Sequence, residues 1–232
     1  MTDLTPQRAA PRLSVERLHG SGAAPALALR RAVFERERGA QGDADDFDAL
    51  ATHLILRDPD RPALGAVGAL RVLDGAAYTG REFDVRPLEA DGRPLAEIGR
   101  ACLHPDYRGG AAGLALLGAA LTELRRRGAA LVTGTASFDG ADPAPHLPAL
   151  RALRDGWAAP PGLRPRARGP DAVVVAGPGR PEDMRAVPPL LKTYLRAGAR
   201  VGEGAWVDHA FRAVDVAVVL ELDRLRVPRR AA

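Results

Sequence analysis

Residues 97–118 place the tightest limits on the fold of this chain, because they join a strand signal, a turn of small residues and a helix signal. The predicted strand must end before Pro105, since proline has no N–H for a central sheet ladder. Small residues at 109–113 predict a tight turn, and the apolar spacing that follows predicts a helix at about 111–127. Another strand is predicted at 129–133. This order predicts a βαβ-like unit with two parallel strands.

The rest of the chain adds strands and helices without an internal repeat, so the predicted fold class is α/β (α+β), a mixed sheet flanked by helices. We expect a single domain at 13–225 after a disordered tail at 1–12, and a long, mobile connection at 73–95. The other predicted strands and helices lie at 13–18, 25–38, 53–57, 65–72, 147–155, 172–175, 189–197 and 213–222.

The charge balance indicates a mildly basic surface but does not identify a partner. The chain has 33 Lys and Arg residues against 29 acids, a formal charge of +4, and Lys192 is its one lysine. Arginine in place of lysine, with much Ala, Gly and Pro, is typical of a GC-rich genome. Aromatic residues make up only 4%, too few for the stacking platforms of single-strand binders, so we expect no nucleic-acid partner.

The cysteine content and the N-terminus favour a cytoplasmic location. Cys102 is the one cysteine, which excludes an internal disulfide framework and a cysteine-only metal site. The N-terminus has no basic segment followed by an apolar one, and no apolar run is long enough to span a bilayer. We therefore expect a cytoplasmic protein, and a peripheral contact with the inner membrane stays open.

The turn at 107–113, Y-R-G-G-A-A-G, is the strongest local signal for ligand binding. Small residues let backbone N–H groups approach a phosphate, and the positive end of the following helix dipole favours an anion. A helix start built from small residues for tight packing explains the composition equally well. The turn lacks the lysine of a nucleotide P-loop, so a P-loop site is not indicated.

Other reactive residues are interpreted as structural. Cys102 and His104 share a face of the predicted strand, but a lone strand cysteine is usually a small buried side chain. Asp208 and His209 are neighbours in an extended segment, so their side chains diverge. The acidic loop at 39–48 lacks the spacing of a calcium loop. No group has metal-ligand spacing, and no metal site is predicted.

Several motifs together resemble known acyltransferases. The turn at 107–113 resembles the pyrophosphate-binding turn R/Q-x-x-G-x-G/A of the GNAT acyltransferases. Counted from Arg108, Gly113 fits the sixth place, whereas Ala111 stands at the fourth, where that pattern has glycine. An ordered series of polar residues also resembles the signature of acyl-homoserine-lactone synthases: Arg30 with Phe34, Asp45 with Asp48, Arg71 after G-A-L, and Glu97 with Arg100 in E-I-G-R.

The likeness to ornithine Nα-acyltransferases covers most of the chain, from about 30 to 222. It rests on E-I-G-R-A-C-L-H-P-D-Y-R-G-G, on A-S-F-D-G-A-D-P, and on the C-terminal segment from L-P-P-L-L-K-T-Y-L-R to A-F-R-A-V-D-V. The resemblance implies transfer of a 3-hydroxyacyl chain from acyl carrier protein to the α-amino group of L-ornithine, giving lyso-ornithine lipid. It also implies no permanently bound cofactor, because the acyl-phosphopantetheine thioester of acyl carrier protein is a co-substrate.

The same resemblance implies roles for individual residues. Glu97 is the first candidate for the general base, with Arg100 beside it; the alternative for this pair is a structural ion pair. The implied substrate-binding residues are Arg30, Phe34, Asp45, Asp48 and Arg71, where Arg71 and Arg100 would bind the ornithine carboxylate and Asp45 or Asp48 its δ-ammonium. The implied phosphopantetheine-binding residues are Arg108, Gly109, Gly110, Ala111, Ala112 and Gly113.

Glu97 and Arg100 face opposite sides of a regular strand, because side chains alternate along it. Both can serve one site only if the strand is bulged or kinked, and Gly99 is the residue where a bulge is expected. GNAT folds carry such a bulge, by resemblance. We therefore predict a bulged central strand at about 97–103.

Two other functions stay open. The first is a related enzyme that makes a lactone or uses coenzyme A thioesters with another amine. The second is a non-catalytic module that binds acyl carrier protein or a membrane surface.

Overall fold

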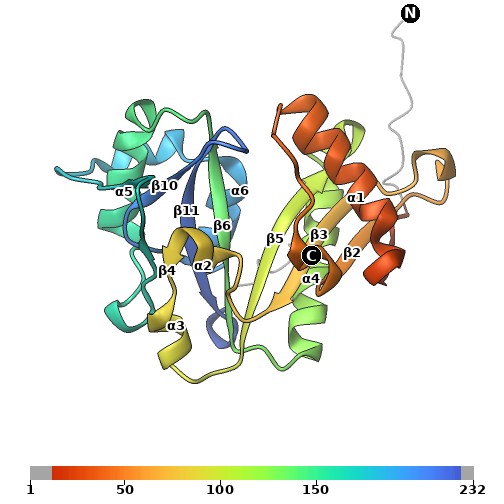
Figure 1. Cartoon of the computed structure of the whole chain (residues 1–232), viewed down its shortest axis with the longest axis horizontal. Helices are drawn as coiled ribbons and strands as arrows, with labels where there is room; N and C mark the ends of the chain where they lie inside the picture. Colours follow the sequence, from red (N-terminus) through yellow and green to blue (C-terminus); the bar gives the residue numbers. More distant parts are fainter. Residues whose placement is uncertain (1–11, 226–232) are drawn as a thin grey trace, which may run out of the picture.

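A computed structural model describes residues 12–225, so the tail predicted at 1–12 lies outside the described residues apart from Arg12. One long mixed sheet runs through the molecule in the order β1-β2-β3-β5-β6-β11-β10-β8, and β9 pairs with β11 (Figure 1). The strands of this sheet are β1 (Ser14–His19), β2 (Thr52–Arg57), β3 (Gly68–Asp74), β5 (Leu95–Leu103), β6 (Leu131–Asp139), β8 (Ala172–Val173), β9 (Arg200–Val201), β10 (Ala205–Asp208) and β11 (Ala213–Glu221). A separate ladder joins β4 (Phe83–Asp84) to β7 (Arg166–Ala167).

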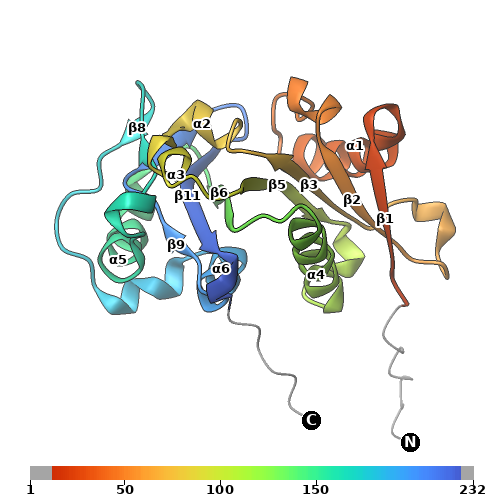
Figure 2. The ribbon, with the colours of Figure 1, turned by 90° about the horizontal axis from the view of Figure 1, so that it is seen from below.

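Helices cover both faces of the sheet, as Figure 2 shows: α1 and α2 lie on one face, and α4, α5 and α6 on the other. Helix α1 continues without a break into a π-helical segment, Arg31–Glu37. The two segments together match the helix predicted at 25–38. The α-helices are α1 (Ala24–Arg30), α2 (Thr79–Glu82), α3 (Arg86–Ala90), α4 (Ala111–Arg126), α5 (Leu147–Trp157) and α6 (Pro189–Arg196). None of these described helices is long and apolar enough to cross a membrane.

Alternation along the strands gives the N-terminal half of the sheet two buried faces. On β3, Leu70 and Val72 pack with the residues of α4, while Ala69 packs with those of α1. On the C-terminal half, β6, β10 and β11 pack against α5 and α6 in a separate apolar cluster. Mixed strands with helices on both sides confirm the predicted fold class.

The connection at 73–95 was predicted to be mobile, and this prediction is wrong: it folds into α2, β4 and α3. Phe83 and Leu88 are completely buried there and anchor the connection to the sheet. Isolated turns of helix this short lack a periodic pattern, so the sequence alone does not reveal them.

The prediction of a bulged central strand is confirmed in β5. Its antiparallel pairing with β3 passes from Ala69↔Cys102 to Arg71↔Gly99, so β5 holds one extra residue. The irregular residue is Arg100, whose φ is 54°. As a result Ile98 faces α4 while Arg100 and Cys102 face the side of α1.

The bulge coincides with the point where β5 and β6 separate. These two strands pair in parallel from Leu95↔Leu131 to Glu97↔Thr133, and within residues 12–225 their ladder ends there. Beyond it the two strands diverge (Figure 1). Gly134, the next residue of β6, allows a close approach at this point, since a Cβ atom there would lie 2.2 Å from the carbonyl oxygen of Ile98.

We expect Gly134→Ala to destabilise the protein by about 1–3 kcal/mol, because the added methyl meets backbone rather than a movable side chain. The free energy of unfolding in urea measures this change. Gly118→Ala on α4 is a matched control: a Cβ there meets nothing within 4 Å, and alanine in a helix should stabilise by about 0.5–1 kcal/mol. Equal stability of the two variants would contradict the close approach at Gly134.

Candidate active site

A cavity of about 820 Å³ lies where β5 and β6 separate, within the size range of small-molecule sites, about 300–1,000 Å³. Its wall combines residues of β5, β6, β11, α4, α6 and the π-helical segment. Much of the wall is apolar and comes from the two helices that flank it: Leu116 and Leu117 on α4, with Leu190 and Leu191 on α6. Arg100, Tyr78, Asp208 and Asp215 add a charged region to the same cavity.

Arg100 enters this cavity because of the bulge. Its guanidinium carbon lies 4.5 Å from the centroid of the Tyr78 ring and 4.4 Å from that of Phe211, so the side chain is held between two rings. Arg100 also forms ion pairs with Asp43 at 3.1 Å and Asp45 at 3.2 Å. The positive charge of Arg100 is therefore fixed in position at the cavity wall.

The predicted substrate-binding residues largely bind one another. Arg30, which is completely buried, donates to Asp43 at 2.8 Å and to Asp48 at 2.6 Å. Arg71 donates to Asp45 at 2.5 Å and to Asp48 at 2.9 Å. Together with Arg100 these residues form a buried ion-pair network that fixes the acidic loop 39–48 over the sheet.

The network keeps Asp48 ionised. Burial by itself raises the pKa of this carboxyl, but hydrogen bonds from Arg30 and from the Asp45 amide outweigh burial and lower it to about 2. Arg30, Arg71, Asp45 and Asp48 do not belong to the wall of the 820 Å³ cavity. Among the predicted substrate-binding residues Phe34 does line it, with its ring edge-on to Phe211 at 5.7 Å between centroids.

Glu97 lies on the same side of β5 as Arg100, as the bulge allows, but its carboxylate points at backbone. It accepts hydrogen bonds from the Tyr78 amide at 2.9 Å, from the Thr79 amide at 2.7 Å and from the Thr79 hydroxyl at 2.6 Å. The side chain is 2% exposed and is not part of the cavity wall. Burial raises the pKa of Glu97 against the effect of these hydrogen bonds.

The geometry of Glu97 therefore differs from that expected of a base in contact with substrate. The carboxylate holds the start of α2, the helix that begins directly after Tyr78. In this arrangement Glu97 holds the backbone of Tyr78, whose ring lies against Arg100. The alternative role, an ion pair between Glu97 and Arg100, is not found either, because Arg100 pairs with Asp43 and Asp45.

The turn at 108–113 has the form expected of an anion site. Gly109 has a φ of 72°, and Gly110 is the N-cap residue of α4, whose N-terminus has no side-chain cap within the described residues. Arg108 and Gly113 line the cavity. Arg108 is held by an ion pair with Glu37 at 2.7 Å. Open backbone N–H groups at a helix N-terminus attract anions, so this end of the cavity suits a phosphate.

Cys102, His104 and His209, which were interpreted as structural, have the following surroundings. Burial raises the pKa of Cys102 to about 12, which keeps its thiol protonated. The His104 ring accepts a hydrogen bond from the Asp106 amide at 3.3 Å. His209 lies 3.3 Å from Asp171.

Sequence reasoning missed one group of side chains. The carboxylate of Glu82, on α2, meets those of Asp208 and Asp215, on the paired strands β10 and β11, and the two aspartates line the charged region of the cavity. Asp215 was the one member of this group that the sequence could have indicated, because a charged residue within the apolar run of β11 is unusual. Glu82 lies in the connection that was expected to be mobile, so the sequence did not indicate its partners.

Comparisons with known proteins agree with this fold. Residues 29–118 match the Acetyltransferase (GNAT) domain model. The solved structure of an N-acyl amino acid synthase from uncultured soil microbes superposes with a TM-score of 0.56 at 12% identity, covering 92% of this chain and 94% of that one. A CoA-dependent acyl-homoserine lactone synthase solved with SAM and isopentyl-CoA gives 0.53 at 14% identity, covering 90% and 83%. At these identities the likeness concerns the fold.

Curated relatives are more similar in sequence. An L-ornithine N(alpha)-acyltransferase of Rhodobacter capsulatus is 40% identical, with 87% of this chain and 86% of the relative covered. The protein of the same name from Brucella abortus is 34% identical, with 85% and 79% covered. By this similarity along most of its length, the chain belongs to the L-ornithine N(alpha)-acyltransferase family and is a GNAT-fold acyltransferase.

Proposed function

We propose that this protein transfers a 3-hydroxyacyl chain from acyl carrier protein to the α-amino group of L-ornithine, giving lyso-ornithine lipid. One observation carries the proposal: a single cavity is lined by an open helix N-terminus, an apolar wall and a group of fixed charges. These are the three features that a phosphopantetheine thioester, an acyl chain and a charged amino acid require. The names of the curated relatives support ornithine as the acceptor.

The donor occupies the α4 side of the cavity in this proposal. The phosphate of the carrier's phosphopantetheine binds the amides of 109–113, with Arg108 beside it. The acyl chain packs along Leu116 and Leu117 of α4 and Leu190 and Leu191 of α6. The thioester is a co-substrate, and the proposal needs no permanently bound cofactor.

The acceptor occupies the charged region. Arg100 binds the α-carboxylate of the amino acid, because a guanidinium has five N–H donors and Arg100 lies in the cavity wall. The rings of Tyr78 and Phe211 and the ion pair with Asp43 hold the guanidinium in place before the substrate arrives. This lowers the entropy cost of binding the substrate. Arg30, Asp45, Asp48 and Arg71 act through the network that positions Arg100, and Phe34 packs beside it.

The reaction balances without a covalent enzyme intermediate. The neutral α-amine attacks the thioester carbonyl, the carbon–sulfur bond breaks as the amide bond forms, and the proton lost by nitrogen ends on the carrier's thiol. An α-amino group titrates near or above neutrality, so a neutral fraction is available to react. Backbone groups of β5 beyond Glu97, which leave the ladder with β6, are available to polarise the carbonyl.

Glu97 acts as a positioning residue in this mechanism. Its three hydrogen bonds fix Tyr78 and Thr79, and Tyr78 in turn covers Arg100. A role as the base that touches the amine would require the carboxylate to leave those donors.

Two exposed leucines support a transient contact with the inner membrane, where the lipid product is released. Leu114, in the first turns of α4, is 69% exposed, and Leu190, at the start of α6, is 44% exposed and lines the cavity. Both helices flank the apolar wall, so a product chain leaving it meets these side chains.

The direct test incubates purified protein with 3-hydroxyacyl-carrier protein and L-ornithine and follows N-acylornithine by mass spectrometry. We expect product with the carrier thioester. If product forms only from coenzyme A thioesters, the donor is coenzyme A and not acyl carrier protein. If the carrier binds but no amine is acylated, the proposed reaction is wrong.

We expect Glu97→Gln to lower kcat/KM for ornithine about tenfold without changing the shape of the pH profile of kcat, since the residue positions Tyr78. Thr79→Val is the matched variant, because it removes the hydroxyl donor and keeps the carboxylate. The two variants should have similar effects. A loss of about 10²–10⁴ in kcat with Glu97→Gln alone, together with loss of the acidic limb of the pH profile, would instead identify Glu97 as the base.

We expect Ala111→Glu to raise KM for the carrier thioester about tenfold, because a carboxylate in the first turn of α4 competes with the phosphate for the same amides. KM for ornithine should not change, and the helix should be slightly more stable. Thr122→Glu, exposed on the same helix three turns away, is the control. Equal donor KM values for both variants would place the phosphate elsewhere.

A further inference from the structure

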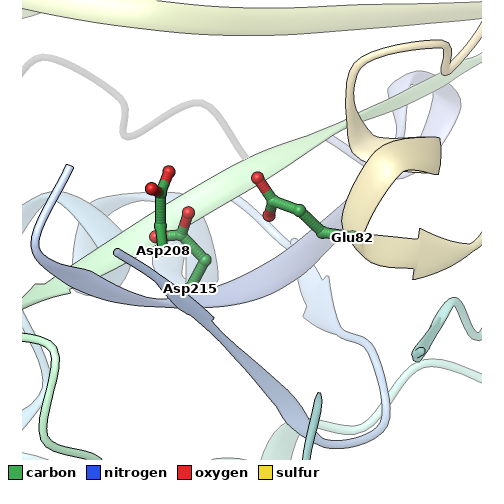
Figure 3. A group of neighbouring side chains, drawn as sticks. All are labelled: Glu82, Asp208 and Asp215. Atoms are coloured by element: carbon green, nitrogen blue, oxygen red, sulfur yellow. The ribbon is translucent and has the colours of Figure 1, made fainter. Parts of the chain in front are cut away.

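The carboxylates of Glu82, Asp208 and Asp215 point toward one another, as Figure 3 shows, and Asp208 and Asp215 line the cavity. Glu82 ends α2, Asp208 ends β10, and Asp215 lies on β11. One oxygen from each lies within 4.8 Å of the other two. The residues are 3%, 6% and 4% exposed, so all three acidic groups are removed from bulk water.

Two of these carboxylates have an oxygen without a donor. Oε2 of Glu82 and Oδ1 of Asp215 are buried and accept no hydrogen bond from residues 12–225. Asp208 differs, because its Oδ1 accepts from the Phe211 amide at 2.8 Å. Buried acceptors without donors are costly, so a protein that keeps two of them side by side indicates a ligand that supplies the missing donors.

The pKa values of these carboxyl groups also indicate that too little positive charge surrounds them. Burial, followed by the charges of Asp215 and Asp208, raises the pKa of Glu82 to about 9. Burial and the charge of Asp208 raise the pKa of Asp215 to about 6, against a hydrogen bond from Ser137. Arg100 faces this group, Arg38 adds a second positive charge near Asp215, and Glu97 adds a further negative charge next to Glu82. Arg100 is already paired with two other carboxylates, Asp43 and Asp45.

We propose that Glu82, Asp208 and Asp215 bind the side-chain ammonium of the acceptor and so select a diamino acid. This inference rests on the proposed function, since it assigns the part of the amino-acid site that contacts the far end of ornithine.

The geometry of the three oxygens suits a primary ammonium. An alkylammonium has three N–H donors, one for each acidic group, and its positive charge lowers the raised pKa of Glu82, so that Glu82 binds it as a carboxylate. Three oxygens at about 2.8 Å from one nitrogen in tetrahedral directions lie about 4.6 Å apart, and the observed oxygens lie within 4.8 Å of one another.

The group suits the amine that stays protonated rather than the amine that reacts. Nearby negative charges stabilise the ammonium form and raise its pKa. Three carboxylates around the α-amine would therefore suppress the neutral nucleophile that the reaction needs. The δ-amine takes no part in bond formation, so for it the same charges give affinity without a loss of reactivity.

Two other assignments fit less well. Asp45 and Asp48, the residues expected from the sequence to bind the δ-ammonium, are occupied by Arg30, Arg71 and Arg100. A calcium ion requires six to eight oxygen ligands, whereas the group found in the described part of the chain has three acidic residues and lies next to the positive charge of Arg100.

The test compares L-ornithine with L-norvaline, which has the same carbon chain without the δ-amine. For the wild-type protein we expect kcat/KM to be about 100-fold higher with ornithine. Asp215→Asn and Glu82→Gln should remove most of this preference, because each deletes one partner of a buried charge pair, and they should lower ornithine turnover far more than norvaline turnover. Glu182→Gln, an exposed carboxylate on another part of the surface, is the matched control and should retain the full preference.

An equal loss of ornithine and norvaline turnover in the two variants would overturn the inference, because it would place the carboxylates at the reacting amine.

Folding of the variants is checked by thermal unfolding without substrate. Glu82→Gln should be more stable than wild type near pH 8. Its raised pKa means that Glu82 stabilises the folded state only in its protonated form, so this stability is lost as pH rises from about 4.5 towards 9.

Equilibrium binding separates this inference from the proposed reaction. Calorimetry with L-ornithine and with 1,4-diaminobutane, without acyl donor, should show binding that Asp215→Asn weakens about 100-fold. This result would support the ammonium site even if no acyl transfer were found. Tight binding of Mn²⁺ or Ca²⁺ that depends on Asp215 and excludes ornithine would overturn it in favour of a metal site.

Discussion

The separation of β5 from β6 after the Glu97↔Thr133 pair is the constraint on which the site depends. A continued parallel ladder would fill the space that the 820 Å³ cavity occupies, and it would turn Arg100 towards α4. The bulge costs backbone strain, since a non-glycine residue at φ 54° is unfavourable by about 1–3 kcal/mol. Ion pairs with Asp43 and Asp45 and the rings of Tyr78 and Phe211 hold Arg100 in that conformation.

The ion-pair network explains why the polar residues that resemble the lactone-synthase signature occur as a set. Arg30 and Arg71 are buried and both pair with buried Asp48, so removing one of the three leaves an uncompensated charge in the interior. A network of this kind requires all of its members at once. Its contribution to function is indirect: it fixes the acidic loop over the sheet and presents Arg100 to the cavity. The resemblance to the lactone-synthase signature therefore identified the residues that support the site. It did not identify the side chains proposed to contact the δ-ammonium of the substrate.

The sequence predicted the regular parts of the molecule because their signals are local. The β5–α4–β6 unit and its small-residue turn follow from periodicity and from proline at 105, and the bulge was expected because Glu97 and Arg100 could not otherwise face one side. The side-chain partners were not predictable in the same way. Glu97 has the spacing of a catalytic pair with Arg100, but its carboxylate binds the amides of 78–79, which lie about twenty residues away in a segment without a periodic pattern. The acidic group is the extreme case, since it joins a short helix to two strands that are more than 120 residues further along the chain.

The proposed acidic site also bears on which amine of a diamino acid is acylated. Both amines of ornithine are nucleophiles when neutral, so a selective enzyme must keep one of them charged or distant from the thioester. Glu82, Asp208 and Asp215 favour the charged form of the amine that they bind, and the two aspartates line the same cavity as Arg100, which would hold the carboxylate. An acceptor bound by its carboxylate and its δ-ammonium is fixed at both ends, and the α-amine is then the one neutral nitrogen free to reach the carbonyl. In this view the same three carboxylates supply both affinity for ornithine and selectivity for its α-nitrogen.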